Sequence, residues 1–164
     1  MVYLVIFIGI CLVIGPVLWL QPSASQKRKA KMRSEAMAKG LQVNLCELPK
    51  LEKQYGEKRK EFNGVAYRMS WRRDDKRRQA EVGSWFCIKG KAEAEGVPPL
   101  WEWKDDKAPS DDMQKILFDV LPQMPKDVVA VESTPETLSI YWSENGQLGD
   151  VDRIVELLES LRKG

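Results

Sequence analysis

Hydrophobic and polar residues alternate in two stretches near the middle of the chain. The first stretch has larger apolar side chains at every second position, namely Val65, Tyr67, Met69 and Trp71. After a charged run, a second set with the same spacing is formed by Val82, Ser84, Phe86 and Ile88. A period of two residues is typical of a strand with one buried face. We therefore predict a β-hairpin with the run RRDDKRR, residues 72–78, at its tip.

Four shorter segments also have the character of strands. Residues 41–48 alternate between apolar and polar side chains, and residues 100–104, LWEWK, follow a loop marked by glycine and proline. Residues 127–133 and 137–143 are separated by a Thr-Pro-Glu turn. We expect residues 100–104 to form a short edge strand and the last two segments to be joined by their turn.

Three segments have the composition and ends of helices. Residues 26–39 lack proline and glycine, and residues 111–121 follow Ser110 as a predicted N-cap. Residues 150–163 form the third. The last two have apolar stripes at helical spacing, namely Met113, Ile116, Leu117, Val120 and Leu121, and Val151, Ile154, Val155, Leu158 and Leu161. Strand pairs with helices between them predict an α+β fold, a mostly antiparallel sheet covered by amphipathic helices.

The first 20 residues contain no charged side chain. As a helix they would reach about 30 Å, the thickness of the hydrocarbon core of a bilayer. Basic residues follow directly, so the positive-inside rule predicts a cytoplasmic C-terminal side and an outer N-terminus. We therefore predict a single transmembrane anchor over residues 1–20, a basic juxtamembrane helix over residues 21–40 and one soluble cytoplasmic domain over residues 41–164. This is the organisation of a single-pass protein of a bacterial-type inner membrane.

The same N-terminal segment has a second interpretation. Ser23, Ala24 and Ser25 have the small side chains of a signal-peptide cleavage site, and cleavage there would release a secreted domain. We favour a retained anchor, because the segment lacks the charged start of a signal peptide. In a reducing cytoplasm we expect Cys46 and Cys87 to be small buried hydrophobes, whereas secretion would favour a disulfide between them.

The basic run after the apolar segment is a candidate contact for anionic lipid headgroups, with about 1 kcal/mol of attraction for each basic residue near the surface. Its members are Lys27, Arg28, Lys29, Lys31 and Arg33. The layout of residues 1–35, with one span, a basic run and a cytoplasmic remainder, resembles the small single-span accessory subunit of the bacterial preprotein translocase. This resemblance rests on topology, and it implies the role of an accessory subunit in a membrane complex.

Charge is distributed unevenly along the chain. Residues 1–91 have nineteen basic and eight acidic side chains, a net charge of +11, and residues 92–164 have seven and sixteen, a net charge of −9. The basic half is suited to an anionic surface. The candidate contacts for an anion or a partner around the predicted hairpin are Arg68, Arg72, Arg73, Lys76, Arg77 and Arg78. We favour a solvated hairpin tip over a nucleic-acid contact, because no nucleic-acid motif accompanies these residues.

Trp101 and Trp103 lie two positions apart, on the same side of the predicted edge strand. Such a pair either anchors a core or forms an exposed hot spot in an interface. We favour the core and keep the two tryptophans as candidate interface aromatics.

The chain contains no histidine. This absence removes the commonest general acid and base and the imidazole ligands of metal sites. The three cysteines form no CxxC pair, and no glycine-rich phosphate loop or GxSxG motif is present. We therefore expect no cofactor, no small-molecule substrate and no catalysis. The sequence favours an interaction or assembly module whose partners are membrane lipid and another membrane protein or a second copy.

Overall fold

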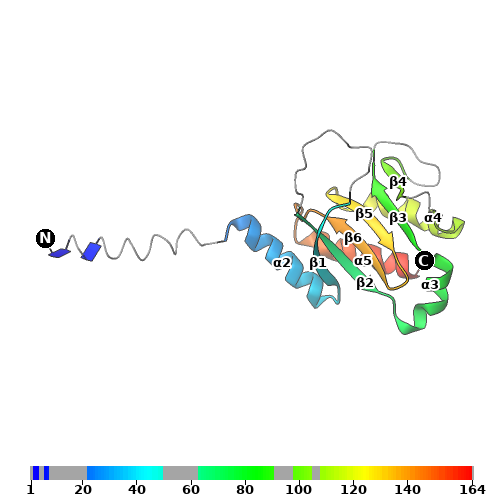
Figure 1. The fold of residues 1–164 in the computed structure, drawn as a ribbon, viewed down its shortest axis with the longest axis horizontal. Coiled ribbons are helices and arrows are strands. Elements are labelled where there is room, and N and C mark those ends of the chain that lie inside the picture. The colour runs from blue at the N-terminus through cyan, green and yellow to red at the C-terminus, as the bar shows by residue number, and fades with distance from the viewer. Residues whose placement is uncertain are drawn as a thin grey trace.

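The computed structural model describes residues 2–3, 6–7, 22–49, 63–90, 98–104 and 108–163. Six strands form one antiparallel sheet, in the spatial order β1-β2-β6-β5-β3-β4 (Figure 1). Their bounds are β1 (Gln42–Glu47), β2 (Asn63–Ser70), β3 (Trp85–Lys89), β4 (Trp101–Trp103), β5 (Val128–Ser133) and β6 (Thr137–Trp142). The strands β1 and β4 are therefore the two edges of the sheet.

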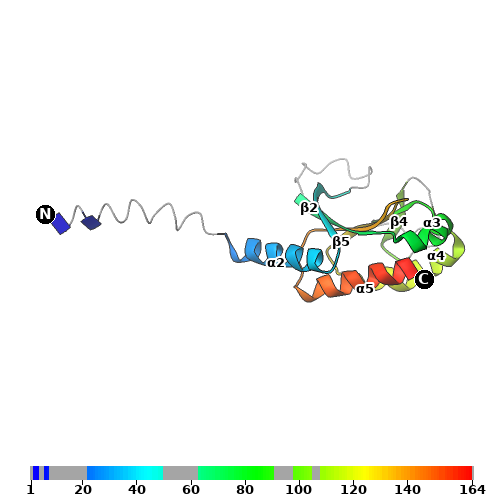
Figure 2. The same ribbon diagram turned by 90° about the horizontal axis from the view of Figure 1, so that it is seen from below.

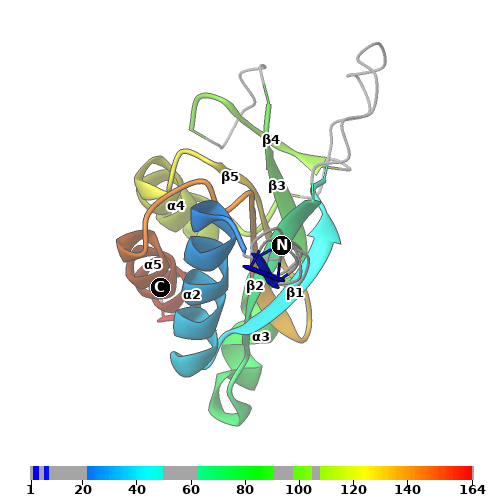
Figure 3. The same cartoon turned by 90° about the vertical axis from the view of Figure 1, so that its left-hand side faces the viewer.

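Helices cover one face of this sheet. The long helices are α2 (Ala24–Ala38), α4 (Asp111–Val120) and α5 (Gly149–Lys163). Figures 2 and 3 show these three helices on the same side of the strands. The short elements are the 3-10 helices η1 (Arg73–Asp75) and η3 (Leu121–Gln123) and the helix α3 (Lys76–Val82). No helix among the described residues covers the opposite side, which we call the open face of the sheet (Figure 3).

The core lies between the sheet and the three long helices. Tyr67 of β2 and Trp142 of β6 are fully buried, with ring centroids 5.2 Å apart in an edge-to-face arrangement. Ile154 and Leu158 of α5 and Leu117 of α4 cover this face of the sheet and are also fully buried. The apolar stripes of the two C-terminal helices therefore have the role that the sequence predicted. The antiparallel α+β fold is confirmed.

The predicted hairpin across residues 72–78 is wrong. The strands β2 and β3 are not neighbours, because β6 and β5 lie between them. Residues 73–82 form η1 and α3, consistent with the helix-forming Lys, Arg, Gln, Ala and Glu in this stretch. In β3 the core receives Trp85 and Cys87, whereas Phe86 of the predicted apolar set lies on the open face. Pairing with distant strands has overridden the local pattern.

The predicted transmembrane anchor is also corrected. A membrane-spanning helix needs about 20 predominantly apolar residues. Within the described ranges no helix is both long enough and apolar enough to cross a bilayer. The helix α2 has 15 residues and includes the basic run. This finding contradicts the single-pass topology and the inner-membrane location. Only residues 2–3 and 6–7 of the predicted span are described, and the rest of residues 1–20 lies outside the described part of the chain.

Candidate interaction site

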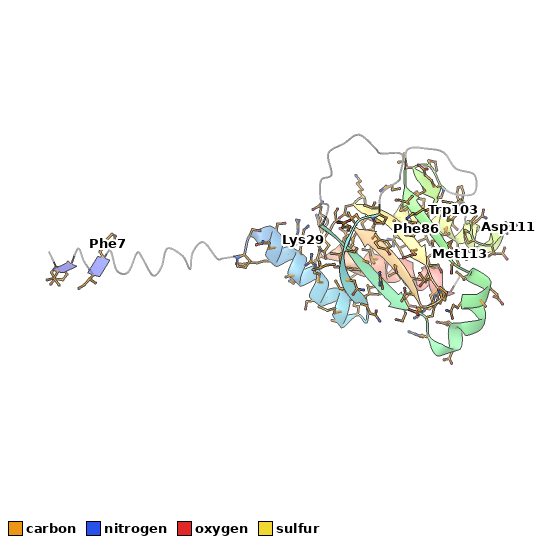
Figure 4. All side chains as sticks on the ribbon, in the orientation of Figure 1. Phe7, Lys29, Phe86, Trp103, Asp111 and Met113 are labelled. Atoms are coloured by element: carbon orange, nitrogen blue, oxygen red, sulfur yellow. The ribbon has the colours of Figure 1, made fainter. Side chains whose placement is uncertain are left out.

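The helix α2 is attached to the fold by two buried apolar side chains and by polar contacts. Its buried residues are Met32 and Ala36. Lys29 donates from Nζ to the main-chain oxygen of Ser143 at 2.9 Å, at the place where α2 meets the sheet (Figure 4). Lys39, the C-cap residue of α2, lies 2.8 Å from a carboxylate oxygen of Asp152 in α5. These contacts fasten both ends of the helix to the segment that follows β6.

The central contact of α2 is an ion pair with a buried carboxylate. Glu144 is completely buried and has a left-handed backbone, with φ of 55°. Arg33 donates from Nε to both carboxylate oxygens, at 3.0 and 2.9 Å, and also from Nη2. The hydroxyl of Tyr67 donates to the same carboxylate at 3.0 Å. The hydrogen bond to Glu144 raises the pKa of Arg33, and burial, together with this carboxylate, raises the pKa of Tyr67.

The remaining basic residues of the predicted lipid contact point away from these anchors. Lys27, Arg28 and Lys31 are exposed, and they form no ion pair with any residue that the structure describes. The basic run is therefore divided. Lys29 and Arg33 attach the helix to the fold, and the exposed basic set of Lys27, Arg28 and Lys31 remains open to solvent.

The edge strand β1 lies beside α2 and is largely exposed. It pairs with β2 on one side, and its other side borders no described strand. From Gln42 to Cys46 it has no charged side chain, and it contains no proline. Its pairing with β2 is continuous from Gln42 to Glu47, without a bulge. Leu45 is 70 % exposed, although the alternating pattern assigned it, with Leu41 and Val43, to the buried face of the strand.

The opposite edge has the features with which proteins block strand pairing. The strand β4 has only three residues, and a short edge strand is a poor template for another chain. Pro98 and Pro99 precede it, and Leu100 before it has a left-handed φ of 72°. Lys104 follows the strand and places its ammonium 5.0 Å from the ring of Phe86. Among the described residues, the edge at β1 is longer, is not preceded by proline and is uncharged from Gln42 to Cys46, although Glu47 ends the strand and Gly40 before it also has a left-handed φ of 85°.

Arg68 belongs to a row of side chains that crosses the open face. In register, Arg68 lies opposite Ser139, Ser139 opposite Glu132, and Glu132 opposite Phe86. Tyr141 donates to Glu132 at 2.6 Å, and its ring centroid lies 5.9 Å from that of Phe86. Burial and the contact with Glu132 raise the pKa of Tyr141 to about 12. In this row Ser139 is fully buried, and the Nε atom of Arg68 is buried without a hydrogen-bond partner among the described residues.

The structure separates the other predicted anion contacts from Arg68. Arg72 lies just after β2, and its Nη2 is 3.9 Å from a carboxylate oxygen of Glu159 in α5. Arg73 belongs to η1, and Lys76, Arg77 and Arg78 belong to the first turns of α3; their side chains lie outside the described part of the structure. The six basic residues are therefore distributed over a strand, a bend and two helical segments.

The two candidate interface tryptophans lie against the core. Trp101 is 3 % exposed, and Trp103 is half-buried with its ring 6.2 Å from that of Trp85. This is the position that the sequence favoured for them.

The described residues offer no obvious metal or thiol chemistry. They include no group of three or more histidine, cysteine or acidic side chains with the spacing of a metal site. Cys46 and Cys87 are both free thiols, on strands β1 and β3, and Cys87 is buried. Burial raises the pKa of Cys87 to about 12, which leaves it as a thiol at neutral pH.

Comparisons of the chain with models of protein families, with curated proteins and with solved structures find no match.

Two of the features described above had no signal in the sequence. Glu144 follows Trp142 and Ser143 at the end of β6, and a single acidic residue at such a place is ordinary for a turn. The alternation of residues 41–48 predicted β1 but not its place at an edge of the sheet. Both features depend on which distant elements meet there.

Proposed function

We propose that this protein is a non-catalytic interaction module that binds an extended segment of a partner protein as an additional strand along β1. The observation that carries this proposal is the six-residue edge strand with continuous register, no internal charge and an exposed Leu45. Proteins commonly protect such edges, and this one protects its other edge. An unprotected, regular edge is the feature that strand-adding recognition modules use.

The energetics of strand addition fit this edge. Alternate residues of β1 point one N–H and one C=O away from β2, where no described strand pairs with them and where an antiparallel partner strand would satisfy them. A main-chain hydrogen bond contributes about 0.5–1.5 kcal/mol net. Burial of the exposed Leu45 side chain contributes up to about 2 kcal/mol. Association and ordering of the partner oppose these gains. We expect micromolar affinities that depend on the partner's side chains.

The rest of the sheet also supports strand addition at β1. The strands β2, β6, β5 and β3 are paired side by side in one antiparallel sheet, so β1 extends an ordered sheet. An ordered template loses little conformational freedom when it binds.

The proposal is tested by selecting binders from a library of displayed random peptides with the full-length protein. Two variants are used in parallel, Leu45→Lys at the β1 edge and Leu100→Lys at the β4 edge. Both side chains are exposed leucines, 70 % and 57 % exposed, so neither change disturbs the core.

We expect the selected peptides to bind the wild-type protein and Leu100→Lys, and to lose about tenfold in affinity for Leu45→Lys. Amide hydrogen exchange should show new protection confined to residues 42–47 when peptide is bound. Peptides that protect another segment, or that bind Leu45→Lys equally well, would falsify the proposal.

A further inference from the structure

The helix α2 divides its basic residues into two groups with different surroundings. Lys29, Arg33 and the C-cap Lys39 each contact the body of the fold. The exposed basic set of Lys27, Arg28 and Lys31 has no ion-pair partner among the described residues. The first group accounts for how the helix is held in place. The second group is not needed for that purpose.

The exposed basic set lies in the N-terminal half of α2, which also contains Lys29. Figures 1 and 2 show that the first turns of α2 extend beyond the β1 edge, on the helix-covered side. The helix also packs directly against β1. A strand added to β1 would therefore lie over the first half of α2. Every second side chain of that strand would point toward the helix.

The charge near β1 determines which kind of partner strand is favoured. The edge strand itself has one charged side chain, the exposed Glu47 at its last position, and none from Gln42 to Cys46. The nearby cations of the exposed basic set provide the electrostatic preference. Complementary charge raises the rate of association and suppresses wrong partners. Two copies paired antiparallel through β1, about an axis normal to the sheet, would place both basic sets on the same side, where they repel each other.

We infer that the segment which β1 receives is acidic, an extended stretch of another protein with aspartate or glutamate at alternate positions, facing the exposed basic set of α2. This inference rests on the proposed strand addition at β1 and adds the chemistry of the partner. It also assigns separate roles to the two halves of the basic run, attachment for one and recognition for the other.

The experiment uses full-length protein and three labelled ten-residue peptides. The peptides alternate valine with glutamate, with lysine, or with glutamate and lysine in turn. Affinities are measured by fluorescence anisotropy over a range of salt concentrations. The test variant is Lys27→Glu/Arg28→Glu/Lys31→Glu, which changes exposed side chains without described partners. The matched control is Lys126→Glu, an exposed cation in the loop before β5. Leu45→Lys serves as the control for the strand contact.

We expect the glutamate peptide to bind at least about tenfold more tightly than the lysine peptide at low salt, with the mixed peptide between them. This preference should weaken as salt is added, because exposed charges are screened beyond about 10 Å at 0.1 M. The triple variant should reverse the preference, whereas Lys126→Glu should keep it. Leu45→Lys should weaken binding of all three peptides.

Other outcomes separate the inference from the proposed function. Equal affinities for the three peptides, all reduced by Leu45→Lys, would overturn the acidic partner and leave strand addition intact. No binding of any peptide up to millimolar concentration would overturn both. Light scattering that shows a dimer disrupted by Leu45→Lys would identify a second copy as the occupant and overturn the inference. Binding of phosphatidylserine vesicles, but of no peptide, through the exposed basic set would assign these cations to a lipid surface.

Discussion

The two edges of the sheet, β1 and β4, differ in how their unpaired main-chain groups are protected. Each edge presents main-chain groups that no strand within the described residues pairs. At β4 the strand is short, two prolines precede it, and Trp101 is buried in the core. At β1 the strand is twice as long and uncharged through Cys46, with Leu45 exposed to solvent. Among the described residues, β4 is protected and β1 is not, which is why we propose that β1 is the functional edge.

The largest difference in the free energy of unfolding is expected between alanine substitutions of an apolar side chain at the two edges. Trp101→Ala should lower the free energy of unfolding by about 3–5 kcal/mol, because it leaves a cavity in the core. Leu45→Ala should change it by less than about 0.5 kcal/mol, because the side chain is exposed. Urea denaturation followed by far-UV circular dichroism measures both. Losses of similar size would contradict the distinction between a buried and an open edge.

The labelling rates of two cysteines compare the two sides of the sheet without a substitution in either strand. Cys46 lies on β1, and Cys87 lies on β3 opposite Trp103 of β4. The pKa of Cys87 is raised to about 12 by burial, so at pH 8 only about 10⁻⁴ of it is thiolate. Burial also raises the pKa of Cys46 above its ordinary value, but this residue is half-buried.

In a Cys11→Ser background, Cys46 of the folded protein should therefore react with a disulfide reagent at least about a hundredfold faster than Cys87. The rate for Cys46 should rise with pH, and the rise should come at higher pH than for an exposed thiol, because burial raises its pKa and the thiolate is the reactive form. Mass spectrometry of quenched samples identifies the labelled residue. Labelling of Cys87 at the same rate in the native protein would show that the β3–β4 side opens as readily as β1.

Removing the ion pair between Arg33 of α2 and Glu144 should lower the free energy of unfolding more than removing an exposed basic side chain of α2. Arg33→Ala leaves Glu144 buried with Tyr67 as its remaining side-chain partner, which should cost about 2–4 kcal/mol, since one third of the Arg33 side chain is open to water. Lys31→Ala should be nearly neutral. Urea denaturation of the two variants in parallel measures both free energies of unfolding. A neutral Arg33→Ala would mean that the ion pair does not fix α2 at the edge.

The smallest effect concerns a residue with a left-handed backbone close to the start of each edge strand. Gly40 precedes the β1 segment with φ of 85°, and Leu100 precedes β4 with φ of 72°. Gly40→Ala should lower stability by about 1 kcal/mol, since an L side chain is strained in this region. Leu100→Asn should raise it by a few tenths to about 1 kcal/mol, because asparagine tolerates the left-handed conformation. Melting temperatures of the two variants should move in opposite directions.

Much of the secondary structure follows from local pattern. The alternation of residues 65–71, the apolar stripes of α4 and α5, and the turn between β5 and β6 all predicted the elements that form. These features depend on neighbours within a few residues, and periods of 2.0 and 3.6 are visible in the chain itself. The antiparallel α+β class follows from their order.

The candidate site needed the tertiary structure. The sequence identified β1 as a strand, but its place at an edge depends on β2 pairing with β6 rather than with β3. The basic run was evident, yet only the packed helix separates Arg33, which is paired with Glu144, from Lys31, which faces solvent. The apolar stretch at residues 1–20 predicted a membrane span, and the described helices do not contain one.

By itself the sequence determined most of the strands, the helices α2, α4 and α5, and the apolar faces of α4 and α5, because these properties are set by residues close together in the chain; it did not predict α3 or the buried face of β3. The order of the strands, the exposed edge at β1 and the burial of Glu144 were decided only by the tertiary structure. Each of these depends on contacts between segments far apart in sequence, and a periodic pattern gives the buried face of an element without naming the element that covers it.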